Sequence, residues 1–257
     1  MKQVSSGHVA LVGAGPGDPE LLTLKAVHMI RRATVVLADD LVSDAVLHFV
    51  RRSARIVHVG KRGGCASTPQ AFIERLMAAE ALKGERVVRL KGGDPFIFGR
   101  GGEEAEHLRA QGIEVEVVNG ITSGLAAATA LGAPLTHREH AHGVIFVTAH
   151  AREGGAPLDW NTLGAAAAQG LTLVIYMGVT AIESVQAGLL RSMPGQTPAA
   201  VVQSVSLPHQ RHALCTLSTL AKTTRDEALA SPSIIIVGNV LHGLQTLAQS
   251  RNHERAA

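Results

Sequence analysis

Short apolar runs alternate with longer amphipathic stretches along the first half of the chain. Five of the runs are rich in valine, isoleucine and leucine and have the length of buried strands. They lie at 9–12, 35–37, 56–59, 87–90 and 114–118. The stretches between them, such as 20–32 and 69–83, have the length and spacing of helices. Strands that alternate with helices in this way predict a parallel sheet with helical crossovers.

The alternation continues in the second half of the chain. Glycine and proline at 132–134 end a helix of small residues predicted at 125–130, and a new set of strands and helices follows. The predicted strands lie at 143–148, 171–177, 199–205 and 233–237. The predicted helices lie at 163–169, 181–191, 217–223 and 240–249. We therefore predict an α/β fold with two domains, 1–133 and 134–257.

Glycine gathers in the stretch that follows the strand at 87–90. Five of the chain's 27 glycines lie between 92 and 102, with an Asp-Pro pair among them. Glu103 and Glu104 then open a helix, where their carboxylates suit the helix dipole. Open α/β sheets bind ligands beyond the carboxyl ends of their strands, and glycine lets a ligand approach the main chain closely. This loop is therefore predicted to bind a ligand rather than simply to connect a strand to a helix.

The loop after the first strand, Gly-Ala-Gly-Pro-Gly at 13–17, superficially resembles a dinucleotide-binding fingerprint. Pro16 lacks a backbone N–H donor, and the next residues predict that the helix begins only after the loop. Asp18 suits the N-cap and Pro19 the first helical position. The apolar face of this helix is predicted to hold Leu21, Leu24, Val27 and Ile30. The spacing therefore argues against a bound diphosphate at this loop.

Charged residues follow the second and third strands. Asp39 and Asp40 come directly after the strand at 35–37, so one is expected to cap the next helix and the other to face a ligand. Lys61 and Arg62 lie in a second glycine-rich loop, at 60–70. Adjacent cations suit the recognition of carboxylates or phosphates, although a solvated turn fits them equally well.

Composition limits the kind of ligand and the compartment. The net charge is +3 and the basic residues are scattered, which suits a small anionic molecule rather than nucleic acid. Two distant cysteines offer no disulfide framework. The short polar start and the lack of a long apolar run predict no signal peptide, no membrane association and a cytoplasmic location. Histidines at 137, 140 and 142 lack the spacing of a zinc site, so no metal is predicted.

Six segments together carry a resemblance to the tetrapyrrole methylase family over nearly the whole chain. They are 12–19 (VGAGPGDP), 39–42 (DDLV), 59–62 (VGKR), 88–104, 120–123 (GITS) and 134–138 (PLTHR). The first segment is similar throughout that family. The runs at 60–62 and 89–104 are more specific, and they are typical of members that methylate uroporphyrinogen III.

The resemblance implies two α/β domains of the tetrapyrrole methylase type, with the active site in the cleft between them. It implies a homodimer with S-adenosylmethionine as methyl donor and S-adenosylhomocysteine as product. The implied reaction is C-methylation of an anionic tetrapyrrole, uroporphyrinogen III, on two pyrrole rings. Its product is precorrin-2, which feeds sirohaem or cobalamin biosynthesis. A later precorrin methylase and a tetrapyrrole-binding module without turnover stay open as alternatives.

The resemblance also implies roles for individual residues. Asp39 would be the general base and Lys61 the partner implicated as proton donor. Contacts to the methyl donor would come from Pro16, Gly92, Gly93, Asp94, Ile97, Thr122, Ser123 and Met177. Carboxylates of the substrate would be held by Arg62, Arg100 and Arg138. The chain departs from the family at two positions, with Ala38 where a tyrosine is common and Val205 where a glycine is usual.

Overall fold

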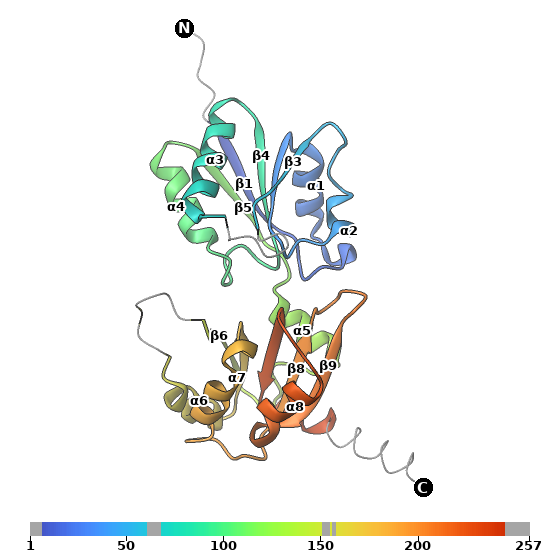
Figure 1. The fold of residues 1–257 in the computed structure, drawn as a ribbon, viewed down its shortest axis with the longest axis vertical. Coiled ribbons are helices and arrows are strands. Elements are labelled where there is room, and N and C mark those ends of the chain that lie inside the picture. Colours follow the sequence, from blue (N-terminus) through green and yellow to red (C-terminus); the bar gives the residue numbers. More distant parts are fainter. Residues whose placement is uncertain (1–6, 61–67, 151–154, 156–157, 245–257) are drawn as a thin grey trace. The chain divides into compact units, whose positions relative to one another are not determined.

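The structure is a computed structural model that describes residues 7–60, 68–150, 155 and 158–244. The chain forms two compact units that divide between Ser123 and Gly124 (Figure 1). The domain boundary predicted after residue 133 falls beyond helix α5 (Ser123–Leu131), most of which belongs to the second unit. None of the helices in the described residues is long and apolar enough to cross a bilayer.

The first unit contains a five-stranded, fully parallel sheet in the order β3-β2-β4-β1-β5. Its strands are β1 (His8–Gly13), β2 (Val35–Ala38), β3 (Arg55–His58), β4 (Arg86–Lys91) and β5 (Glu114–Val118). Its α-helices are α1 (Leu24–Arg32), α2 (Asp44–Leu47), α3 (Gln70–Leu82) and α4 (Gly101–Ala110). The predicted parallel sheet with helical crossovers is confirmed for this unit.

Helices cover both faces of this sheet (Figure 1). On one face, alternate strand residues such as Leu11 and Leu37 pack with the buried sides of α3 and α4. On the other face, residues such as Val12 and Leu90 pack with α1 and α2. A sheet buried on both sides explains why its central strands are continuous apolar runs in the sequence.

The helix predicted over 20–32 is interrupted in the structure. Asp18 caps a short 3-10 turn, η1 (Pro19–Leu21), as the sequence predicted, and its carboxylate accepts the N–H of Glu20 at 2.9 Å. Thr23 then caps α1, which begins at residue 24. This restart rotates the helix, so Leu24 is 84% exposed and the prediction that it faces the sheet is wrong.

The second unit contains a mixed sheet in the order β6-β7-β10-β8-β9, in which only β6 and β7 pair in parallel. Its strands are β6 (Gly143–Thr148), β7 (Leu171–Tyr176), β8 (Pro198–Gln203), β9 (Arg211–Thr216) and β10 (Ser233–Val237). Its other elements include α6 (Trp160–Ala168), α7 (Ile182–Leu189), α8 (Leu220–Asp226) and the short 3-10 turn η4 (Asn239–Leu241). Edge strand β9 was not predicted from the sequence, because its apolar run, Ala-Leu-Cys, is short and is flanked by polar, partly exposed residues.

Opposite faces of the second sheet are covered by different helices. Residues of α6, α7 and α8 share one core with alternate strand residues such as Leu173 and Ile175. On the other face, the N–H of Gly124 at the start of α5 donates to the Tyr176 hydroxyl at 2.9 Å. A side chain at Gly124 would collide with Val174 on the same face, so this position needs glycine for the helix to approach the sheet.

Candidate active site

Three loops of the first unit meet at a junction of glycines beyond the carboxyl ends of β1, β4 and β5. Gly93 donates its N–H to the Gly15 carbonyl at 2.7 Å, and Gly15 returns a bond to the Gly93 carbonyl at 3.2 Å. Gly13 packs against Gly120, where an added methyl group on Gly13 would lie 2.6 Å from the Gly120 Cα. Several glycines of the predicted ligand loops are therefore needed for the approach of one main chain to another.

Asp94, predicted to contact the methyl donor, braces this junction with its carboxylate. Its Oδ1 accepts the N–H of Phe96 at 2.8 Å. Its Oδ2 accepts the N–H of Gly120 at 3.1 Å and the side-chain amide of Asn119 at 3.2 Å. The residue is buried, so the carboxylate ties the loop after β4 to the loop after β5.

Except for Ile97, the donor-binding residues predicted in the first unit lie at or beside this junction. Pro16 follows Gly15, which is bridged to Gly93. A methyl group built on Gly93 would come no closer than 3.8 Å to Thr122 and 3.9 Å to Ser123. Gly93 has φ +68°, and a Cβ there would make only ordinary van der Waals contacts. Because this left-handed conformation favours glycine, the loop carries no side chain at this point.

The two remaining predicted donor contacts are Ile97 and Met177. Ile97 belongs to the turn after Asp94, where its N–H donates to the Asp94 carbonyl at 3.3 Å. Met177 belongs to the second unit, directly after β7. It has φ +54° and is 44% exposed, an unusual backbone conformation for a residue other than glycine. Strain of this kind is found at functional sites more often than elsewhere.

Asp39, the predicted general base, directly follows β2 and is held at both its main chain and its side chain. Its N–H donates to the Leu90 carbonyl at 3.0 Å. Its Oδ1 accepts the N–H of Asp40 at 3.0 Å, and its Oδ2 lies 3.7 Å from the Arg89 guanidinium. The side chain is 33% exposed, so the carboxylate is restrained yet accessible.

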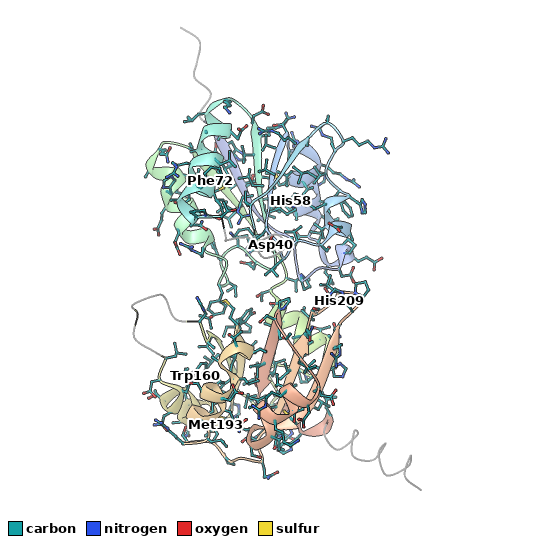
Figure 2. The ribbon with its side chains drawn as sticks, viewed as in Figure 1. Asp40, His58, Phe72, Trp160, Met193 and His209 are labelled. Carbon is teal, nitrogen blue, oxygen red and sulfur yellow. The ribbon has the colours of Figure 1, made fainter. Side chains whose placement is uncertain are left out.

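Asp40 has a different environment from Asp39. It lies beyond the end of β2, near the point where His58 ends β3 (Figure 2). A methyl group added to Gly60 would overlap the Asp40 carboxylate, so the two residues are in close contact. The expectation that one aspartate caps the next helix is wrong, because Ser43 caps α2 with its hydroxyl.

A buried cluster of charges lies behind Asp39 and was not found from the sequence. Arg89 and Lys91 project from the same face of β4, and Glu104 meets them from the first turn of α4. All three are at most 3% exposed. Burial, and next the neighbouring Arg89 charge, lower the pKa of Lys91, while the Glu104 carboxylate opposes this shift. The signal was the alternation of basic residues at 89 and 91, which places both on one face of a strand.

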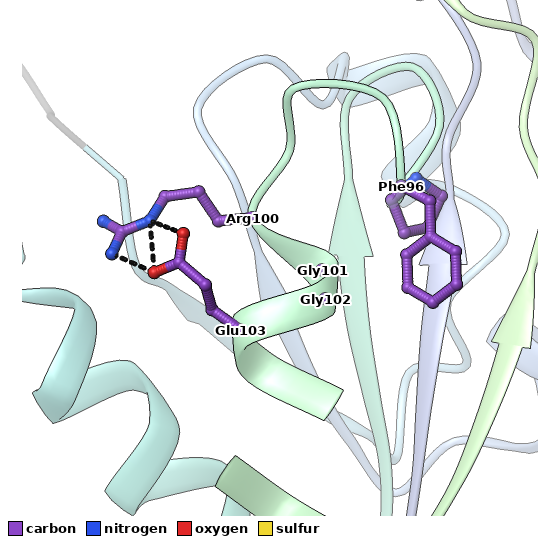
Figure 3. Close-up of a pocket in the computed structure, with 6 residues that line it drawn as sticks. Phe96, Arg100, Gly101, Gly102 and Glu103 are labelled. Carbon is purple, nitrogen blue, oxygen red and sulfur yellow. Dashed lines mark hydrogen bonds and ion pairs between the residues drawn. The ribbon is translucent and has the colours of Figure 1, made fainter. Parts of the chain in front are cut away.

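An open pocket of about 360 Å³ lies beside the loop after β4. It is lined by Pro95, Phe96, Arg100, Gly101, Gly102 and Glu103 (Figure 3). Arg100, predicted to bind the substrate, donates from Nη2 to Glu103 at 2.5 Å and from Nε at 3.1 Å. This hydrogen-bonded pairing with Glu103 raises the pKa of Arg100. Asp39 and the glycine junction do not line this pocket.

Of the other predicted cations, the structure describes only Arg138. Lys61 and Arg62 lie outside the described residues. Arg138 is exposed in the second unit. Its neighbours in the chain, His137, Glu139 and His140, are exposed and close together. One possible ligand atom from each of the three lies within 4.8 Å of the others. The two imidazole rings stack with their centroids 4.6 Å apart and an angle of 19° between their planes, and the N–H of Glu139 donates to His137 Nδ1 at 3.2 Å.

Comparisons with known proteins identify relatives over most of the chain. The family model for Tetrapyrrole (Corrin/Porphyrin) Methylases matches residues 8–221. A uroporphyrinogen-III C-methyltransferase of Pseudomonas aeruginosa is 54% identical over 91% of this chain and 94% of its own length. Siroheme synthase 3 of Aeromonas hydrophila is 49% identical over 92% of this chain. The match covers 50% of that longer protein.

A solved structure agrees with these sequence relatives. Uroporphyrin-III C-methyl transferase from Thermus thermophilus, complexed with S-adenyl homocysteine, has a TM-score of 0.78 and 40% identity to the chain. The similarity covers 92% of this chain and 99% of that one. The sequence motifs, the two α/β units and these matches agree, and the chain belongs to the tetrapyrrole (corrin/porphyrin) methylase family.

Proposed function

We propose that the protein transfers methyl groups from S-adenosylmethionine to two pyrrole carbons of uroporphyrinogen III. The product is precorrin-2, which feeds the biosynthesis of sirohaem, cobalamin or both. The observation that carries this proposal is the high identity, over nearly the whole of both chains, to the Pseudomonas aeruginosa protein named for this reaction. The accessible carboxylate of Asp39, beyond the carboxyl end of β2, adds the acid–base group that the chemistry requires.

The methyl donor carries an activated methyl group on a sulfonium centre. The protein therefore has to align the donor with the pyrrole carbon and keep water away from the reacting atoms. We assign the donor contacts to Pro16, Gly92, Gly93, Asp94, Ile97, Thr122, Ser123 and Met177. Asp94 acts here through its main chain, since its carboxylate is occupied by Phe96, Asn119 and Gly120.

Proton removal completes each methylation. Methyl transfer to an electron-rich pyrrole carbon leaves a cation on the ring system. The methylated carbon itself carries no hydrogen, so another position of the macrocycle must lose the proton. Asp39 accepts this proton and, while ionised, also stabilises the cation. Lys61 either donates a proton or binds a carboxylate of the substrate.

Cations on the loops bind the carboxylates of the tetrapyrrole, and we assign this role to Arg62, Arg100 and Arg138. Arg100 is already paired with a carboxylate, that of Glu103. Its ion pair with Glu103 is more than half exposed on both sides. Exposed pairs of this kind contribute only about 0–1 kcal/mol, so a substrate carboxylate can replace Glu103 at little cost.

The working form of the enzyme is a further part of the proposal. By its resemblance to the family, we expect a homodimer in the cytoplasm. Size-exclusion chromatography with light scattering would show a mass near twice 26.8 kDa if this is right. A mass equal to that of one chain at micromolar concentration would contradict the dimer.

The decisive experiment is an anaerobic assay of the purified protein with uroporphyrinogen III and S-adenosylmethionine. Mass spectrometry counts the methyl groups added, and absorbance follows the product. Two added methyl groups would support the proposal. Transfer only to a more highly methylated corrin precursor would identify a later precorrin methylase instead. Binding of both ligands without turnover would identify a binding module.

A cheaper experiment tests the donor alone. Isothermal titration calorimetry with S-adenosylhomocysteine measures affinity without any tetrapyrrole. Saturable binding with one site per chain is expected. A heat signal no larger than dilution would exclude the proposed donor.

A further inference from the structure

We propose that Glu104 is a positioning residue for methyl transfer, because it holds Arg89 in the orientation that places a guanidinium beside Asp39. This inference rests on the proposed function, in which Asp39 is the general base. Glu104 is itself completely buried, so it acts through Arg89 rather than on the substrate.

The position of Glu104 is fixed by several donors at once. Its Oε1 accepts Arg89 Nε at 3.1 Å, Lys91 Nζ at 3.0 Å and Gln70 Nε2 at 3.1 Å. These partners come from β4 and α3, whereas Glu104 comes from α4. One carboxylate oxygen therefore links a strand to two helices behind the proposed site.

Two of the three guanidinium nitrogens of Arg89 are held by hydrogen bonds. Its Nε donates to Glu104, and its Nη1 donates to the carbonyls of Leu37 and Leu90, both at 3.4 Å. Its Nη2 lies 3.7 Å from the Oδ2 of Asp39. Because a guanidinium is planar and rigid, fixing Nε and Nη1 also fixes the direction of Nη2.

The spacing between Arg89 and Asp39 leaves the proposed base free to react. At 3.7 Å the charges attract, but the separation exceeds that of a hydrogen bond. The other oxygen of Asp39 is occupied by the N–H of Asp40. Arg89 therefore restrains the carboxylate, while no hydrogen bond from the described residues occupies Oδ2, which can accept a proton from the substrate.

Charge balance explains why a carboxylate is needed at position 104. Arg89 and Lys91 are two buried cations on one face of a strand, and without Glu104 they would repel one another. The other oxygen, Oε2 of Glu104, is buried and has no hydrogen-bond partner among the described residues. Burying this oxygen costs stability, which is consistent with a role in the site rather than in folding alone.

The first test replaces Glu104 with glutamine, which has the same shape but no charge. The variant is expected to lose about 10- to 100-fold in kcat, as a displaced reacting group would cause. Its KM for the donor and its affinity for S-adenosylhomocysteine should change by less than about threefold, since the glycine junction is untouched. Loss of donor affinity equal to the loss of kcat would overturn the proposal.

Glu80→Gln is the matched control. Glu80 is another nearly buried carboxylate in the same unit that pairs with two cations, Arg55 and Lys83. Its removal tests whether loss of any buried ion pair lowers activity. Unchanged kcat in this control, beside a reduced kcat in Glu104→Gln, supports a specific role for Glu104. An equal reduction in both variants overturns it.

A double-mutant cycle with Asp39→Asn supplies the sharper test. If Glu104 acts through Arg89 on Asp39, Glu104→Gln should lower kcat less than twofold once Asp39 has been replaced. The same fold loss in both backgrounds would show independent action and overturn the proposal. Wild-type kcat in Asp39→Asn would overturn it as well. If Glu104→Gln does not fold, Arg89→Lys takes its place in the cycle.

A crystal structure of Glu104→Gln gives an answer that does not depend on the substrate. The distance from Arg89 Nη2 to Asp39 Oδ2 is expected to lengthen beyond about 5 Å as the freed guanidinium turns. An unchanged distance would overturn the positioning role. Failure of the proposed function is a separate result, in which wild-type protein adds no methyl group to uroporphyrinogen III.

Discussion

At the scale of single residues, Asp39 combines restraint with access. Its main chain is bonded to Leu90 of the neighbouring strand, and its carboxylate lies between Asp40 and Arg89. Asp94, a carboxylate of the same unit, is instead buried and fully engaged in bracing loops. The environment of each aspartate therefore fits the roles proposed for it, a general base for Asp39 and a link between loops for the carboxylate of Asp94.

Replacement of Asp39 by alanine is expected to lower kcat by about 10²- to 10⁴-fold, the range typical for loss of a general acid or base. Affinity for S-adenosylhomocysteine should stay within a few-fold of wild type, because the glycine junction does not depend on this side chain. Steady-state assays and calorimetry measure the two quantities. Parallel loss of both would mean that Asp39 is structural.

At the scale of elements, the loop junction depends on close contact between main chains. Gly13→Ala should destabilise the protein by about 1–3 kcal/mol or more, because the new methyl group would overlap the main chain of Gly120. Gly102→Ala, in α4, is the matched control. It has open space for a methyl group, so it should stabilise by about 0.4–1 kcal/mol. Urea unfolding measures both, and equal effects would contradict the proposed packing.

The stability that Glu80 of α3 contributes, through its ion pairs with Arg55 of β3 and with Lys83, should depend on pH. The hydrogen bond from Lys83 lowers the pKa of Glu80, and the nearby charge of Arg55 acts in the same direction, while burial opposes them. A carboxyl whose pKa is lowered by folding stabilises the protein above its ordinary pKa of 4.5, and this stability is lost as the pH falls through the lowered value.

Glu80→Gln should therefore melt below wild type at pH 6, and the difference should shrink as the pH falls to about 3. Protonated glutamic acid and glutamine then have the same charge, so their contacts become alike. Thermal melts across this range give the measurement. A difference in melting temperature that stays constant with pH would show that charge is not the cause.

At the scale of the whole molecule, each unit has its own hydrophobic core and its own sheet. The proposed donor and substrate residues nevertheless come from both units, since Met177 and Arg138 belong to the second. Folding and methyl transfer should therefore be separable by truncation.

A fragment of residues 1–123 is expected to fold and to melt cooperatively, as judged by circular dichroism. It should transfer no measurable methyl groups, because it lacks Met177 and Arg138. Full activity in the fragment would remove the second unit from the proposed mechanism. A fragment without a melting transition would show that the first core does not suffice alone.

The amino-acid sequence by itself determined the parallel sheet of the first unit, because strands buried on both faces are continuous apolar runs. It also located the glycine loops and Asp39 at strand ends, since these signals are local in the chain. The sequence predicted less about features that depend on residues elsewhere in the chain. Edge strand β9 is recognisable only from its pairing with β8, and the exposure of Leu24 follows from where Thr23 restarts the helix.

Only the tertiary structure decided what the charged side chains do. The sequence does not show that Asp94 bonds to Gly120, or that Glu104 meets Arg89 across fifteen positions. Both contacts depend on how strands and helices are placed side by side. A charge in a sequence becomes a base, a brace or a positioning group only when folding sets its neighbours and its distance from water.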